Sequence, residues 1–194
     1  MSTRVPRTAL APQDWVEAGL QALADGGLEA IRIEVLAAGL HATKGSFYWH
    51  FADRAALVDA VLALWEQRGT EDVIARLGAI EDPLERLRVL FQLTFDSPRA
   101  GAVDVVLMAH ADDARVAPVL DRVTRRRLEA MTEIVVAAGV PVEHAGHRAL
   151  QAYLAWVGLL QVSASMPQVL PTGVARERFI RSVLGHLSGL LTPR

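Results

Sequence analysis

Apolar side chains recur at the spacing of one helix face near the start of the chain, at Trp15, Ala18, Gly19, Ala22 and Leu23. Steps of three and four residues predict an amphipathic helix, and the glycine pair at 26–27 marks its end. The same spacing returns in a second set, at Leu57, Ala60, Val61, Leu64 and Trp65. Asp53 is a suitable N-cap, so we expect a second helix from there into the 70s.

Proline and glycine divide the rest of the chain. The pair Asp82-Pro83 predicts a helix start, because proline suits the first turn, and Ser97-Pro98 with Gly101 predicts its end. Residues 103–108 are too short to assign from the pattern alone, and their helical context favours a helix. Three further helices are expected around the apolar sets within 116–135, 150–157 and 180–191. No alternating apolar and polar run competes, so the sequence predicts an all-helical fold.

Composition limits the chemistry that the chain performs. Its 194 residues are 52% hydrophobic and include no cysteine, which excludes disulfides, thiolate metal sites and a cysteine nucleophile. Acidic residues number 22 and basic residues 20, so any contact with nucleic acid must come from a local patch. Lys44 is the only lysine, and the other basic residues are all arginine.

One long stretch without charge raises the question of a membrane span. No charged residue lies between Arg148 and Arg176, but polar residues and a proline interrupt the stretch, at Gln151, Gln161, Ser163, Ser165 and Pro167. A span needs about 20 mainly apolar residues, so the pattern favours a buried or interface helix. The basic start at 1–7 has no apolar run of signal-peptide length behind it, and the expected location is the cytoplasm.

Residues 33–57 carry the strongest functional signal. Leu36, Ala37 and Leu40 predict the inner face of a short helix, and Thr43 can cap a second short helix after a tight turn. Two helices joined this way form a helix-turn-helix, whose second helix enters the DNA major groove. We expect Phe47 and Phe51 to anchor that second helix to the core, as their four-residue spacing puts them on one face.

The run from Thr43 to Phe51, followed by Arg54, Ala56 and Leu57, resembles the helix-turn-helix signature of TetR-type transcriptional repressors. The resemblance covers about the first 65 residues. It implies an all-α fold with a three-helix DNA-binding domain at 1–55 and a helical ligand-binding and dimerisation domain at 56–194. It further implies a homodimer that a small-molecule effector releases from a palindromic double-stranded DNA operator. The expected DNA-binding residues are Arg32, Thr43, Lys44, Gly45, Ser46, Tyr48, Trp49, His50 and Arg54.

The chain departs from the family pattern at two positions. His41 stands in the turn where the family has glycine, so we expect a positive φ at some conformational cost. Arg32 stands where the family starts its second helix with threonine, which removes a cap worth about 1 kcal/mol. An arginine there could contact a DNA phosphate instead.

Several of these residues have a simpler interpretation. Lys44 could be an ordinary surface lysine, Tyr48 a half-buried packing residue, and Trp49 an aromatic leaning on the scaffold. The triplet at 125–127 is interpreted as a solvated or interdomain face of a long helix. The histidines at 144 and 147 share a helix face, but no third metal ligand follows by spacing.

No catalytic motif accompanies the helix-turn-helix pattern, so we expect no enzyme, no metal and no cofactor. Large apolar residues on the later helices are the candidates for an effector pocket: Phe91, Phe95, Met108, Met131, Tyr153 and Trp156. The last two helices are the expected dimer interface, because their apolar faces exceed what one chain can cover. The rival function is a helical ligand-binding protein or enzyme that does not act on DNA.

Overall fold

The computed structural model describes residues 10–96 and 98–191, apart from the side chains of 94–96, 98–100, 184 and 186–191. Within these ranges every regular element is a helix and no strand occurs, which confirms the all-helical prediction. The backbone forms two compact units, one up to Leu64 and the other from Trp65 onward. This division falls later than the expected boundary at 55/56, because α4 (Arg54–Glu66) runs through that position without a break.

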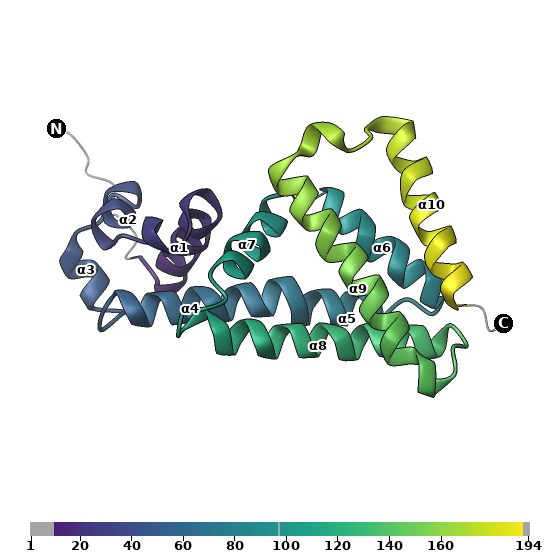
Figure 1. The fold of residues 1–194 in the computed structure, drawn as a ribbon. Helices are drawn as coiled ribbons and strands as arrows, with labels where there is room; N and C mark the ends of the chain where they lie inside the picture. The colour runs from purple at the N-terminus through teal and green to yellow at the C-terminus, as the bar shows by residue number, and fades with distance from the viewer. Residues whose placement is uncertain (1–9, 97, 192–194) are drawn as a thin grey trace. The chain divides into compact units, whose positions relative to one another are not determined.

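The first unit contains a small helical domain and most of α4 (Figure 1). Its elements before α4 are α1 (Pro12–Gly26), the 3-10 turn η1 (Leu28–Ala30), α2 (Ile33–Gly39) and α3 (Lys44–Tyr48). The Thr43 hydroxyl caps α3 by accepting from the Ser46 amide at 3.2 Å. The Asp53 carboxylate likewise accepts from the Ala56 amide at 2.8 Å, so both predicted caps are confirmed.

The core of the first unit joins α1 to the helices that follow it. Its largest fully buried side chains are Trp15, Leu23, Ile31, Phe47, Leu57, Val61 and Leu62. Gly19 lets α1 approach α4 closely, because a Cβ at this position would lie 2.6 Å from Cγ2 of Val61. The apolar face predicted for the helix that is α1 therefore packs on the apolar face predicted for the helix that is α4.

The second unit begins at the end of α4, which continues into the π-helical turn η2 (Gln67–Glu71) and then α5 (Asp72–Gly78). The later elements are α6 (Pro83–Asp96), α7 (Pro98–Ala109), α8 (Val116–Ala137), α9 (Val142–Ser165), η3 (Pro167–Val169) and α10 (Gly173–Leu191). The predicted start at Asp82-Pro83 and the helix over 103–108 are confirmed. Ser97 lies outside the described residues, and Gly101 lies inside α7 instead of ending a helix.

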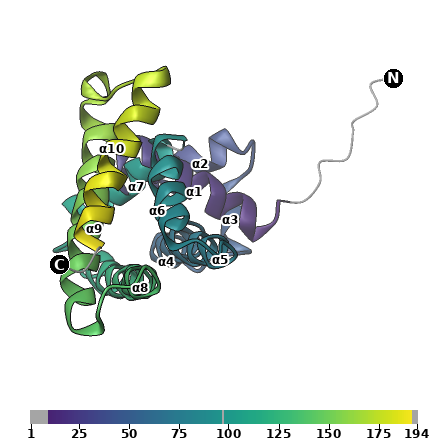
Figure 2. The same ribbon diagram turned by 90° about the vertical axis from the view of Figure 1, so that its right-hand side faces the viewer.

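In the second unit, α5 and α8 lie side by side, and Figure 2 views both nearly along their axes. Helix α9 packs on α7 and α8, and α10 packs on α6. The buried cluster between them includes Leu77, Phe91, Met131, Val135 and Tyr153. Among the described residues, no helix has both the length and the apolar character to cross a membrane. The uncharged stretch of α9 contributes Trp156 and Leu160 to the buried cluster instead.

Candidate functional site

Phe47 holds α3 against the first unit from a fully buried position. Its ring meets the Trp15 ring edge-on at a centroid distance of 5.3 Å and stacks on Phe51 at 5.5 Å. A helix of five residues is too short to be stable alone. The buried phenyl ring therefore fixes the orientation of α3, as the four-residue spacing of Phe47 and Phe51 predicts.

The opposite side of α3 faces outward. Tyr48 is 58% exposed and Trp49, just after the helix, is 87% exposed. His50 is exposed as well, and Gly45 and Ser46 lie in the first turn. Both aromatic residues lie at the C-terminal end of α3, where Tyr48 is the last residue and Trp49 the C-cap, and the Tyr48 ring meets the Phe47 ring edge-on at 5.2 Å. Tyr48 therefore combines packing on Phe47 with an exposed surface, whereas Trp49 is almost fully exposed.

Lys44 is the first residue of α3, and its Nζ lies 2.6 Å from Oε1 of Glu34 on α2. Both side chains are more than half exposed. The hydrogen bond from Lys44 lowers the pKa of the Glu34 carboxyl below its ordinary value. A DNA base or phosphate that binds Lys44 must therefore compete with the Glu34 carboxylate for its ammonium group.

The two arginines among the predicted DNA contacts differ in their surroundings. Arg32 is exposed at the N-cap of α2 and makes no side-chain cap hydrogen bond there, as expected from the loss of threonine. Arg54 donates from Nε to the Ile31 carbonyl at 2.7 Å and from Nη2 to the Leu28 carbonyl. Arg54 thus ties the start of α4 to the segment between α1 and α2. Its three other N–H groups, two on Nη1 and one on Nη2, donate to no residue that the structure describes and are left for a phosphate.

His41 has a φ of +52°, the one positive φ of a non-glycine residue in the described chain. The positive φ predicted for His41, in the turn where the family has glycine, is therefore confirmed. The left-handed region costs a non-glycine residue about 1–2 kcal/mol. The turn between α2 and α3 carries this strain next to the exposed residues of α3.

Replacing His41 by glycine is expected to raise the free energy of unfolding by about 0.5–1 kcal/mol, because part of the relieved strain is offset by glycine's greater freedom when unfolded. His41→Val should lower it by about 1–2 kcal/mol, since a β-branched side chain tolerates positive φ poorly. Urea unfolding of both variants measures the difference. Equal midpoints for the two variants would contradict this explanation of the turn.

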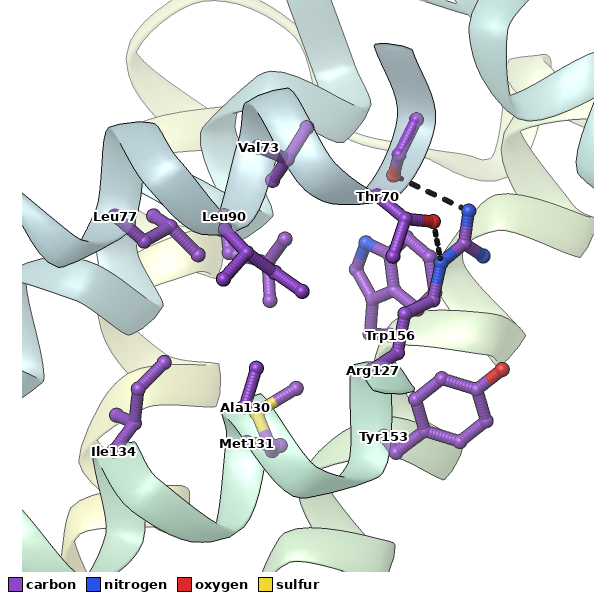
Figure 3. Close-up of a pocket in the computed structure, with 12 residues that line it drawn as sticks. Thr70, Val73, Leu77, Leu90, Arg127, Ala130, Met131, Ile134, Tyr153 and Trp156 are labelled. Carbon is purple, nitrogen blue, oxygen red and sulfur yellow. Dashed lines mark hydrogen bonds between the residues drawn. The ribbon is translucent and has the colours of Figure 1, made fainter. Parts of the chain in front are cut away.

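A second candidate site is a cavity between α5 and α8 in the second unit (Figure 3). Apolar side chains from α5, α6 and α8 form most of its wall, including Val73, Leu77, Leu90, Met131 and Ile134. The cavity encloses about 40 Å³ of free space, which is room for about three water molecules at most. A cavity of this kind is the default ligand site in a helical domain.

Arg127 supplies the charge at one end of this cavity, although its side chain is 8% exposed. Its Nη1 lies 2.5 Å from Oδ1 of the buried Asp104, and its Nε donates to the Thr70 hydroxyl at 2.9 Å. Its guanidinium carbon lies 5.2 Å from the centre of the Trp65 ring and 5.0 Å from that of Trp156. The interpretation of 125–127 as a solvated face is thus wrong for its third member.

The π-helical turn takes part in this arrangement. Nη2 of Arg127 donates to the Gly69 carbonyl at 3.2 Å. A Cβ at Gly69 would lie 3.3 Å from that nitrogen, so only glycine leaves the guanidinium its place without a shift. The π-turn connects α4 to α5, and single π-turns often mark functional positions.

The predicted effector residues divide into three groups. Met131, Tyr153 and Trp156 line the cavity. Phe91 is 2% exposed in the buried cluster, and Met108 is partly buried on α7; neither lines a described hollow beside Arg127. The side chain of Phe95 lies outside the described residues. The sequence reasoning missed Thr70, Asp104 and Arg127.

Known proteins resemble this chain in sequence over residues 16–61 and in fold over nearly its whole length. Residues 16–61 match the family model described as bacterial regulatory proteins, tetR family. Curated protein sequences give no match. A transcriptional regulator from Rhodococcus sp. RHA1 has a similar structure, with a TM-score of 0.74 and 19% identity over 94% of this chain and 96% of that one.

Two further solved structures have the same fold. A TetR-like transcriptional regulator from Rhodococcus sp. RHA1 has a TM-score of 0.69 and 18% identity, covering 98% of this chain and 100% of its own. AibR, solved in complex with isovaleryl coenzyme A and operator DNA, has a TM-score of 0.64 and 20% identity, covering 90% and 96%. A helix-turn-helix unit followed by a helical second unit is thus the fold that this chain shares with these transcriptional regulators. The match to the tetR family model covers residues 16–61, the helix-turn-helix part of the chain.

Proposed function

We propose that the chain is a homodimeric repressor that binds a palindromic operator and leaves it when a small molecule occupies the second unit. The observation that carries the DNA-binding part is α3, a short helix anchored by buried Phe47 and exposing Tyr48 and Trp49. In this proposal the chain binds DNA and a ligand and catalyses no reaction. Chromosomal DNA as the target places the activity in the cytoplasm.

The residues of α3 divide into two roles in this proposal. Lys44, Gly45 and Ser46 in the first turn read base edges in the major groove, where a helix N-terminus approaches the bases. The other predicted contacts hold phosphates and fix the docking: Arg32, Thr43, Tyr48, Trp49, His50 and Arg54. Arg54 acts mainly by positioning α4, because two of its donors bind backbone carbonyls.

The proposed dimer uses the apolar side chains that α9 and α10 leave exposed. Leu150 is 43% and Leu154 58% exposed, one helical turn apart on α9, and Phe179 on α10 is 37% exposed. Charge-poor apolar surface is typical of the core of a homodimer interface. A symmetric dimer would present two copies of α3, separated by about 34–36 Å or a simple multiple for a B-DNA operator.

Effector coupling would pass through the helix that the two units share. Helix α4 starts at Arg54 in the first unit and continues into the π-turn, whose Gly69 and Thr70 line the cavity. A ligand that moves this turn would move the end of α4. Such coupling is typically worth about 1–3 kcal/mol and is reciprocal, so operator DNA should weaken effector binding by the same factor.

The test is a gel-shift titration with DNA from upstream of the protein's own coding region at about 0.15 M salt. Lys44→Ala is expected to weaken specific binding by about 1–3 kcal/mol if Lys44 reads a base. Glu34→Gln should strengthen it by a few-fold at most, because it releases Lys44 from a surface ion pair. Sedimentation of the complex should show two chains per operator.

Arg125→Ala is the matched control, since it also removes an exposed cation from a carboxylate pair, here with Asp121 on α8. It should change operator affinity less than Lys44→Ala. If no DNA is retained, a genome-wide selection replaces the upstream fragment. Failure there as well would overturn the regulator proposal in favour of a ligand-binding protein that does not act on DNA.

A further inference from the structure

Two hollows of the second unit meet at the buried ion pair between Arg127 and Asp104. Arg127 lines the small apolar cavity, and Asp104 lines a larger neighbouring hollow of about 310 Å³. Both hollows share wall residues, among them Gly69 and Trp156. The ion pair therefore lies where an apolar cavity adjoins a wider hollow that charged side chains also line, and a ligand reaching both would pass it.

Not all of the N–H donors of the Arg127 guanidinium are used. Three of its five N–H groups are used, by the Thr70 hydroxyl, the Asp104 carboxylate and the Gly69 carbonyl. The other two find no acceptor within the part of the chain that the structure describes. A buried cation with unused donors favours an acceptor that arrives from outside, and a carboxylate or phosphate fits its fork best.

Charge around the pair also favours an anion. The larger hollow is lined by Arg68 and Arg76 as well as by Asp72 and Asp104. With Arg127 this makes three cations against two carboxylates, a surplus of one positive charge. A ligand anion could thus bind the guanidinium of Arg127, and Asp104 would still line the same hollow as Arg68 and Arg76.

The small cavity has a more apolar wall than the larger hollow. Among the described residues that line it, Arg127 alone is charged, and most of the rest of its wall is apolar. Its narrow free space suits the end of a thin hydrocarbon tail better than a bulky ring or a hydrated head group. The head group would then lie toward the larger hollow, beside the arginines.

We propose that the effector is an amphiphilic organic anion, with its acidic head group on Arg127 and a short apolar tail between α5 and α8. This inference rests on the proposed effector site and specifies its ligand chemistry. The head group would displace Asp104 from Nη1 and leave the Thr70 and Gly69 bonds as the link to the π-turn. Occupancy would thereby act on the segment that ends α4.

Isothermal titration calorimetry of the full chain without DNA tests this with four hexyl probes at pH 7: hexanoate, hexyl phosphate, 1-hexanol and hexylamine. At least one anion should bind about tenfold tighter than hexanol, because charge-assisted bonds to arginine are stronger than neutral ones. Hexylamine should bind most weakly. Whichever anion binds more tightly identifies the head group as a carboxylate or a phosphate. Hexanol or hexylamine binding as tightly as both anions, or no anion binding at millimolar concentration, would overturn the proposal.

The matched variant removes both charges at once, Arg127→Met with Asp104→Leu, so that no single charge stays buried. It should lose about tenfold in anion affinity and keep its affinity for hexanol within about twofold. Equal loss for both probes would show a packing effect and contradict the anion site. If this variant does not fold, the wild-type probe series alone decides. The gel shift without ligand tests the DNA function separately, so failure of either assignment is recognisable.

Discussion

Arg127→Met is expected to lower the free energy of unfolding by about 3–5 kcal/mol, because it leaves the carboxylate of Asp104 buried without its cation. The two side chains are only 8% and 7% exposed, so a carboxylate left without its partner there is poorly solvated. The variant also loses the hydrogen bonds to Thr70 and Gly69 and the contacts with both tryptophan rings. Urea unfolding, followed by circular dichroism, measures the loss.

A double-mutant cycle separates the ion pair from the packing. Asp104→Leu alone should be similarly destabilising, since it leaves the guanidinium buried. The double variant should regain most of the loss, because well-packed apolar residues often replace a buried pair at little cost. Additive losses in the double variant would show that the two charges do not depend on each other. Arg126→Met is a control, because its pair with Glu71 is longer, at 3.6 Å, and more exposed.

The burial of Arg127 could be predicted from the sequence, but its pairing with Asp104 could not. Three consecutive arginines look alike in a sequence, but successive residues of a helix point about 100° apart. Arg127 lies four residues after Val123 and four before Met131, which places it on the buried stripe of α8. That spacing was available from the sequence. Its partner Asp104 lies on another helix, and no local pattern pairs the two.

The predictions that held were those with local causes. The caps at Thr43 and Asp53, the proline start at residue 83 and the left-handed turn at His41 each depend on a few neighbouring residues. Helical periodicity likewise follows from the chain itself. The order of the helices and the anchoring of Phe47 could therefore be predicted without any knowledge of the packing.

The effector cavity could be predicted only in part. An apolar residue at a periodic position faces the interior, but the pattern does not say whether it meets other side chains or an empty space. Phe91 and Met131 show the difference, since both are buried and only Met131 lines the cavity. The π-turn was missed for a related reason, because residues 67–71 carry no proline that interrupts the expected helix.

Phe47→Ala is expected to lower the free energy of unfolding of the first unit by about 3–5 kcal/mol, the usual loss for a fully buried phenylalanine. Operator binding should be lost with it. Helix α3 has five residues, and Phe47 supplies its ring contacts with Trp15 and Phe51. Without that anchor the exposed side chains of α3 have no fixed direction. Thermal unfolding and a gel shift on the same preparations measure the two losses.

Trp49→Ala is the matched aromatic variant, because its side chain is 87% exposed and stands two residues away. It should change stability by no more than about 0.5 kcal/mol, as expected for a surface position, yet weaken operator binding. The two variants would then weaken operator binding for different reasons. Phe47→Ala would disrupt the fold of α3, and Trp49→Ala would remove part of the surface that contacts DNA. If Trp49→Ala destabilised the chain and left operator affinity unchanged, the aromatic side chain would belong to the scaffold. The DNA-binding surface would then be limited to the residues around Lys44 and Tyr48.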